Sequence, residues 1–125
     1  MMRRGAIRVS LMMFAAVEVG CASFDPPPVE GLVASAAQKR GLEEARVEHG
    51  HELYITACVK CHRPVRPDSF SEANWDDILP KMVKRAKLDE QSHQDIRAYV
   101  FSVRDAMIEA KEEQKLQEQN QKEMK

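Results

Sequence analysis

Cys58-Val59-Lys60-Cys61-His62 is the stretch of sequence on which the fold of this 125-residue chain depends. Residues three apart lie on the same face of a helical turn, so the thiols of Cys58 and Cys61 are expected side by side. The imidazole of His62 follows directly. Two thiols and an imidazole within five residues indicate either a binding site for a cofactor or metal, or a redox-active thiol pair.

These alternatives make different demands on the neighbouring sequence. A thioredoxin-like thiol pair requires a preceding strand in a βαβ context, which the flanking residues do not supply. A zinc site requires two further ligands, and the spacing of His49 and His51 matches no common zinc finger. Covalent haem attachment requires two thiols to form thioethers with the porphyrin vinyl groups, and an adjacent histidine to bind the iron. The motif therefore predicts one covalent haem c, held by Cys58, Cys61 and His62.

The first twenty residues have the pattern of an export signal. Arg3, Arg4 and Arg8 are basic, an apolar run follows at 9–17, and small residues mark a boundary at 20–23. The apolar run is too short to cross a bilayer, which takes about 20 residues. We therefore expect residues 1–20 to be a signal peptide that is removed.

Cys21 is the third cysteine of the chain, and the haem motif does not account for it. Val19-Gly20-Cys21 resembles the end of a bacterial lipoprotein signal, in which the cysteine becomes lipid-bearing, although Glu18 departs from that pattern. An ordinary cleaved signal is the alternative. A lipid on Cys21 would hold the chain at the periplasmic side of a bacterial membrane without a spanning helix. Ala22, where aspartate would retain a lipoprotein at the inner membrane, favours the outer membrane.

The remaining chain divides into three parts. Residues 21–40 are expected to form a lipid-anchored linker. Three consecutive prolines at 26–28 favour an extended chain, and residues 32–40, whose alanines could start a helix, lack a strong apolar stripe. Residues 111–125 are rich in Glu, Gln and Lys and lack an apolar stripe, so we expect a charged tail that is helical or disordered. Residues 41–110 are left as the compact domain.

Only helical periods occur in this domain, and no segment alternates with period two. One predicted helix leads into Cys58, either continuous or broken at Gly50. A second begins after Ser71 and a third after Asp89, both favourable N-cap residues. Their apolar faces consist of Trp75, Ile78, Leu79, Met82 and Val83, and of Ile96, Tyr99, Val100 and Val103. The sequence therefore predicts an all-α fold.

A domain of about 70 residues has a marginal core, so the haem is expected to complete it. The aromatic side chains are few and are the expected packing partners of the porphyrin. They are Tyr54, Phe70, Trp75 and Tyr99.

The sixth ligand of the iron is predicted to be Met82, which lies on an apolar helical face 20 residues after His62. Pro80 is expected to kink this helix and could turn the Met82 sulfur towards the iron. Met107 lies at the end of the last apolar stripe and Met124 in the charged tail, so both are poorer candidates. The rival distal ligands, which would lower the reduction potential, are His49, His51 and His93.

The order of these residues resembles that of the small single-haem class I cytochromes c of bacterial periplasmic electron transfer. The likeness covers residues 50–103 and consists of Gly50, Leu53 and Tyr54 before the motif, then Trp75, Ile78, Met82, Leu88, Ile96, Tyr99 and Val100 after it. The resemblance implies haem attachment through Cys58 and Cys61, axial ligands His62 and Met82, and the transfer of single electrons. Pro80 and the short segment between the two ligands depart from the larger members of the family.

Charge is distributed unevenly along the chain. Residues 1–20 contain three of the 19 basic and one of the 20 acidic residues, so the remainder has a net charge of −3. Residues 60–87 carry seven basic and four acidic side chains, a net charge of +3. A basic rim beside the haem would attract an acidic redox partner, with a simple solvated helix face as the alternative. Nucleic acid is not an expected partner in this compartment.

We therefore expect a membrane-tethered single-electron carrier, which is not itself an enzyme but could be the cytochrome subunit of a larger oxidoreductase. The alternative is a gas-binding or sensing haem protein with an open or labile sixth position. A haem enzyme would need a distal acid/base set, which isolated histidines do not provide.

Overall fold

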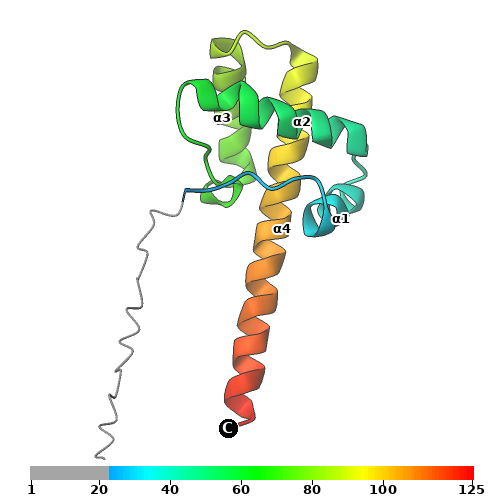
Figure 1. The fold of residues 1–125 in the computed structure, drawn as a ribbon, viewed down its shortest axis with the longest axis vertical. Helices are drawn as coiled ribbons and strands as arrows, with labels where there is room; N and C mark the ends of the chain where they lie inside the picture. The colour runs from blue at the N-terminus through cyan, green and yellow to red at the C-terminus, as the bar shows by residue number, and fades with distance from the viewer. Residues whose placement is uncertain (1–22) are drawn as a thin grey trace, which may run out of the picture.

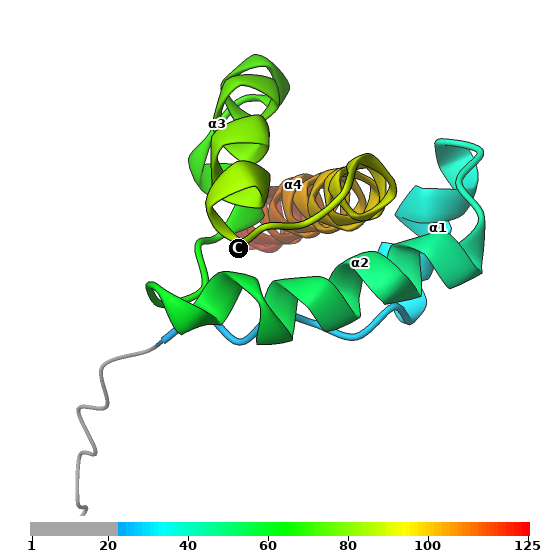
Figure 2. The same cartoon turned by 90° about the horizontal axis from the view of Figure 1, so that it is seen from above.

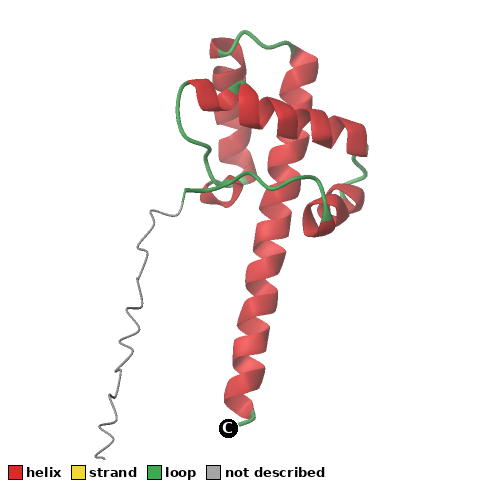
Figure 3. Cartoon of the chain, in the orientation of Figure 1, coloured by secondary structure: helices red, strands yellow, loops and turns green. Residues whose placement is uncertain are grey.

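The computed structural model describes residues 23–125 and is helical. Its elements are α1 (Gly31–Lys39), α2 (Glu44–Thr56), α3 (Glu72–Arg85) and α4 (Glu90–Glu123), with short 3₁₀ turns η1 (Cys58–Lys60) and η2 (Pro67–Ser69). The described part of the chain contains no strand (Figure 3). The prediction of an all-α fold is confirmed.

Helix α4 is the central element, and the other three helices lie around it (Figures 1 and 2). Helix α2 crosses α4 at Gly50, where an added Cβ atom would lie 1.9 Å from the carbonyl oxygen of Asp95. Glycine is therefore required for this close approach of two backbones. Of the two alternatives for the first predicted helix, the continuous one is observed, because α2 runs through Gly50 without a break.

The starts of α3 and α4 agree with the sequence prediction. The Ser71 hydroxyl accepts a hydrogen bond of 3.2 Å from the Asn74 amide, and the Asp89 carboxylate accepts one of 2.8 Å from the Ser92 amide. These bonds satisfy amides that have no partner inside the helix. Pro80 does not interrupt α3, which continues to Arg85.

The linker predicted for residues 21–40 is wrong over its second half, which forms helix α1. Val33, Ala36 and Ala37 are buried and share one face of this helix, which packs against α4. Two of these three residues are alanines, so the apolar stripe is hard to recognise in the sequence. Their small side chains nevertheless allow the helix to pack closely. The compact domain therefore begins before residue 41.

The proline-containing segment before α1 is extended, as predicted, but it is docked on the domain. The Tyr99 hydroxyl donates a hydrogen bond of 2.7 Å to the Pro27 carbonyl oxygen. Val29 is buried, and Phe24 is partly buried against the same core. Residues 21 and 22 lie outside the described part of the chain. From Phe24 onwards the segment is a part of the domain, not a free tether.

The charged tail is helical, one of the two predicted alternatives. It continues α4 to Glu123 and projects away from the other helices (Figure 1). Two ion pairs hold its base against the domain, one between Lys39 and Glu109 at 3.3 Å and one between Lys111 and Asp68. Residues 111–125 are otherwise exposed.

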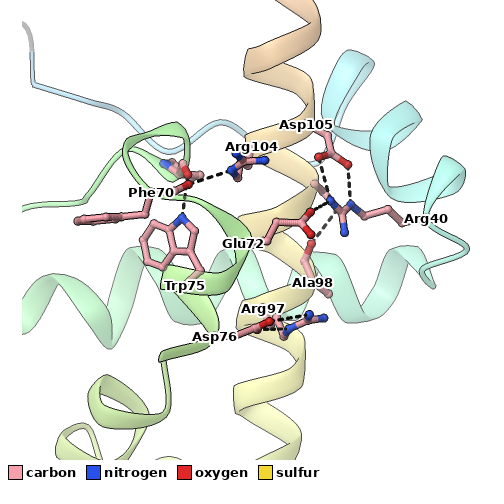
Figure 4. Close-up of polar contacts among 11 residues, drawn as sticks. Arg40, Phe70, Glu72, Trp75, Asp76, Arg97, Ala98, Arg104 and Asp105 are labelled. Carbon is pink, nitrogen blue, oxygen red and sulfur yellow. Dashed lines mark hydrogen bonds and ion pairs between the residues drawn. The ribbon is translucent and has the colours of Figure 1, made fainter. Parts of the chain in front are cut away.

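Arg40, at the end of α1, links three helices (Figure 4). Its guanidinium donates to Asp105 on α4, with Nε at 2.5 Å from the carboxylate, and also to Glu72 on α3. The hydrogen bond that Arg40 donates to Asp105 is the main reason that the pKa of Arg40 is raised. A second pair joins Arg97 to Asp76 at 2.6 Å, again between α4 and α3.

Helix α3 ends in a turn that places Lys87 in the left-handed region, with φ of 56°. The Leu88 amide donates to the Val83 carbonyl across this turn at 3.0 Å. Because glycine adopts this conformation without steric cost, we expect Lys87→Gly to raise the free energy of unfolding by about 0.5–1 kcal/mol. Lys84→Gly, within the helix, should instead lower it by about 1 kcal/mol. Urea unfolding followed by circular dichroism would measure both free energies. Equal changes in the two variants would contradict the left-handed conformation of Lys87.

Asp68 is expected to make the free energy of unfolding depend on pH in the acidic range. Hydrogen bonds from Arg66, with Nε at 3.1 Å, and then from Lys111 lower the pKa of Asp68 to about 2. A lowered pKa stabilises the fold above the unfolded value of about 3.9, and this contribution is lost as the pH falls towards 2. We expect Asp68→Asn to be less stable than the parent at pH 7, with the difference disappearing between about pH 4 and pH 2. Thermal unfolding at several pH values would test this.

The control for that measurement is Asp77→Asn, since Asp77 is exposed and makes no ion pair with a described residue. A loss of stability in Asp68→Asn that stays constant from pH 7 to pH 2 would contradict the prediction.

Candidate functional site

A groove lies between the C-terminal end of α2, with η1, and the C-terminal half of α3. Its cavity volume is about 120 Å³. Most of its lining is apolar and consists of Ala57, Leu79, Val83, Ala86, Leu88 and Ile96. The other lining residues are Cys58, Cys61, His62, Met82 and Arg85. The structure thus brings all four residues predicted to bind the haem to one groove.

The imidazole of His62 is oriented by the backbone that follows it. Its Nδ1 atom lies 2.7 Å from the carbonyl oxygen of Arg63. A carbonyl only accepts, so Nδ1 carries the proton and Nε2 keeps its lone pair. A histidine held in this way has Nε2 available as a metal ligand. The His62 side chain itself is exposed.

Two side-chain hydrogen bonds fix the loop that follows His62. The Tyr54 hydroxyl donates to the Val65 carbonyl. The Trp75 indole donates to the Pro67 carbonyl at 2.8 Å, and the Phe70 ring meets the Trp75 ring edge-on at 5.4 Å between centroids (Figure 4). The loop is therefore tied to α2 on one side and to α3 on the other.

The four aromatic side chains predicted to pack on a porphyrin lie outside the groove. They are Tyr54, Phe70, Trp75 and Tyr99. Tyr54, Trp75 and Tyr99 are buried in the protein's own core, and desolvation raises the pKa of Tyr54 and of Tyr99. Helix α1, missed in the sequence, supplies part of that core.

Cys58 does not have the surroundings of a reactive thiol. Burial raises the pKa of Cys58, whereas reactive thiols have a lowered pKa that favours the thiolate. The helical context of the pair also lacks the strand that a thioredoxin-like motif follows. Within residues 23–125, no group of three His, Cys, Asp or Glu side chains is placed to hold a metal ion. The geometry therefore favours neither the dithiol nor the zinc hypothesis.

Met82 lines the groove from α3, across from η1, and is partly buried. The two other candidate methionines do not line it. Met107 packs against the core from α4, and Met124 is 85% exposed near the end of the chain. Position thus separates Met82 from its rivals.

The rival histidines also lie outside the groove. His49 contacts Asp95, with Nδ1 and Oδ2 2.8 Å apart, and the His51 ring lies 5.0 Å from that of Tyr99. His93 is 3.4 Å from the Glu90 carboxylate. Each has a local contact away from the groove.

The buried carboxylate of Asp95 accepts hydrogen bonds from three side chains, one of which is His49. Burial alone would raise the pKa of Asp95, but hydrogen bonds from His49, Arg46 and Gln91 lower it. The His49 and Arg46 bonds join α2 to α4, next to the crossing at Gly50. His49 therefore has a structural partner.

Basic side chains without a carboxylate partner lie on the two segments that form the groove. They are Lys60, Arg63, Lys81, Lys84, Arg85 and Lys87, all exposed, and none forms an ion pair within residues 23–125. By contrast, Arg40, Arg46, Arg66 and Arg97 each have a carboxylate partner. We call these six residues the basic rim. Its charge is free to act on a molecule outside the protein.

The donor set and lining of the groove fit a haem c. Two thiols three positions apart, an imidazole with a free Nε2 and a thioether on the facing helix are the groups needed for covalent attachment and axial ligation. The cavity volume is close to the roughly 150 Å³ of an engineered cavity that takes benzene. It would therefore enclose only part of a porphyrin, and the rest would lie at the open side or require the walls to separate.

Arg85 is the lining residue that the motif and stripe analysis did not single out. It lies three residues after Met82, and this spacing places both on one face of α3. In the sequence, Arg85 is one of the seven basic residues of the segment 60–87. Its position relative to Met82 was the signal that could have identified it.

Comparisons with protein-family models, curated proteins and solved structures gave no match. In the part of the chain that the structure describes, no helix is both long and apolar enough to cross a membrane.

Proposed function

We propose that this chain is a single-electron carrier with one covalent haem c, ligated by His62 and Met82. The observation that carries the proposal is the meeting of Cys58, Cys61, His62 and Met82 at one apolar groove. Sequence spacing alone accounts for the first three, but Met82 reaches the groove through the packing of α3. Bound haem would supply reversible one-electron chemistry at its iron.

The chain's own residues have distinct roles in this proposal. Cys58 and Cys61 would hold the haem, each by addition of its S–H group across one vinyl group, which forms one C–S bond and moves the hydrogen to the other vinyl carbon. His62 would offer its Nε2 lone pair to the metal, while Nδ1 keeps its proton and donates it in a hydrogen bond to the Arg63 carbonyl. Met82 would offer a thioether sulfur from α3, a ligand that raises the reduction potential.

The basic rim supports an acidic protein as the redox partner. Its six cations are unpaired within the described chain and lie on the segments that form the groove. Such a surface speeds the encounter with a partner of opposite charge, most strongly at low ionic strength. Electron transfer to an acidic partner should therefore slow as salt is added.

Attachment to the periplasmic side of a bacterial membrane through lipid on Cys21 is part of the same proposal. Because Phe24 is packed on the domain, only residues 22 and 23 separate it from Cys21. Three peptide steps reach at most about 10 Å. A lipid there would hold the domain against the bilayer surface, with little freedom to move away. Cys21→Ser should release the protein from the membrane fraction.

The deciding experiment is expression with a haem-attachment system, followed by absorbance and intact-mass measurements. We expect a Soret band and a mass increase of one haem that survives denaturation. Cys58→Ala together with Cys61→Ala should abolish the covalent mass, while Cys21→Ser should keep it. A parent protein without Soret absorbance or added mass would refute the proposal, and rapid carbon monoxide binding by the native protein would favour a gas-binding function.

A further inference from the structure

Arg85 has no role in the fold that the described contacts reveal. It is exposed at the end of α3 and makes no ion pair with a carboxylate in residues 23–125. Yet it lines the groove, together with apolar residues and the four proposed haem-binding residues. The guanidinium is therefore solvated and free to bind an anion beside the groove, because no described carboxylate occupies it.

The position of Arg85 is fixed by the helix that carries it. The last turn of α3 is a favourable place for a cation, because the carbonyl end of a helix has a partial negative charge. Leu79, Val83 and Ile96 are buried lining residues, whereas Arg85 is exposed. The guanidinium therefore lies at the open side of the groove, one helical turn beyond Met82.

Haem, like the groove, has an apolar part and a charged edge. Its macrocycle is apolar, and its two propionate carboxylates lie at the edge away from the vinyl groups. In an apolar groove, the carboxylates must remain at the solvent side or meet a cation, since an unpaired buried charge is costly. Arginine binds a carboxylate through two parallel hydrogen bonds, a geometry that lysine cannot reproduce.

We infer that Arg85 binds a propionate of the haem and thereby fixes the orientation of the macrocycle relative to Met82. This inference rests on the proposed function. Arg85 is distinguished from the rest of the basic rim because the other five members do not line the groove. Its positive charge beside the cofactor also favours the reduced iron, so it raises the midpoint potential.

The test compares Arg85→Gln, Arg85→Lys and Lys84→Gln with the parent holoprotein by spectroelectrochemistry and by circular dichroism in the Soret region. Lys84→Gln is the matched control, because it removes the same charge from the adjacent exposed residue, which does not line the groove. We expect Arg85→Gln to lower the midpoint potential more than Lys84→Gln and to change the Soret dichroism. Arg85→Lys should restore part of the potential.

Equal shifts in Arg85→Gln and Lys84→Gln, with unchanged Soret dichroism, would overturn the inference while leaving the haem proposal intact. Failure of haem attachment in Arg85→Gln but not in Lys84→Gln would also support it, since the exposed arginine has no described protein carboxylate partner to lose. A parent protein that carries no haem would overturn the proposed function, and this inference with it.

Discussion

Gly50→Ala is expected to destabilise the fold by at least about 3 kcal/mol, although alanine favours a helix by about 1 kcal/mol over glycine. The added Cβ atom would lie 1.9 Å from the Asp95 carbonyl oxygen and 2.6 Å from its carbon. Both are backbone atoms, so no side-chain rotation can relieve the overlap, and α2 and α4 must separate. Because small domains are stable by only about 5–15 kcal/mol, this is a large fraction of the total.

Urea unfolding followed by far-UV circular dichroism would measure this loss. Glu48→Ala is the control, since Glu48 is exposed on the same helix and makes no ion pair with a described residue. It should change the free energy of unfolding by no more than about 0.5 kcal/mol. If Gly50→Ala were as stable as the parent, the close crossing of α2 and α4 would be incorrect.

Met82→Ala is expected to have the largest effect on the proposed haem site. The oxidised protein should lose the methionine-to-iron charge-transfer band, and the reduced protein should bind carbon monoxide rapidly at the opened position. Because methionine ligation raises the potential, the midpoint should fall by on the order of 0.1 V or more. Optical and paramagnetic spectroscopy, with redox titration, would measure these changes.

Two further variants separate ligation from packing. Met82→Leu keeps an apolar side chain of similar volume on the groove but removes the sulfur, so it should show the same spectral loss as Met82→Ala. Met107→Leu changes a partly buried methionine that does not line the groove, and its spectrum should match the parent. An unchanged spectrum in both Met82 variants would exclude Met82 as the ligand.

The helices that carry the site could be predicted from sequence because their determinants are local. Ser71 and Asp89 cap the helices that follow them, and the stripe Ile96, Tyr99, Val100 and Val103 is buried throughout. A helix cap depends only on the cap residue and the turn that follows it, and an apolar stripe depends only on the helical period, so both can be recognised in a short stretch of sequence.

Helix α1 could not be predicted in the same way. Its buried face consists of Val33 and two alanines, which contribute little hydropathy and become a packing surface only when α4 lies against them. The three prolines before it correctly indicated an extended chain. They gave no information on whether that chain was free or docked, because the bond from Tyr99 to Pro27 spans 72 positions of sequence.

The spacing of Cys58, Cys61 and His62, and with it the haem hypothesis, was determined by the sequence alone, since all three lie within one short segment. Which methionine faces them was decided by tertiary structure. Met82 and Met107 lie on helices and Met124 follows the end of α4, and only the packing of α3 beside η1 brings one of the three to the groove. The same packing brought Arg85 there, because a groove is formed by surfaces that meet across the fold and not by residues adjacent in the chain.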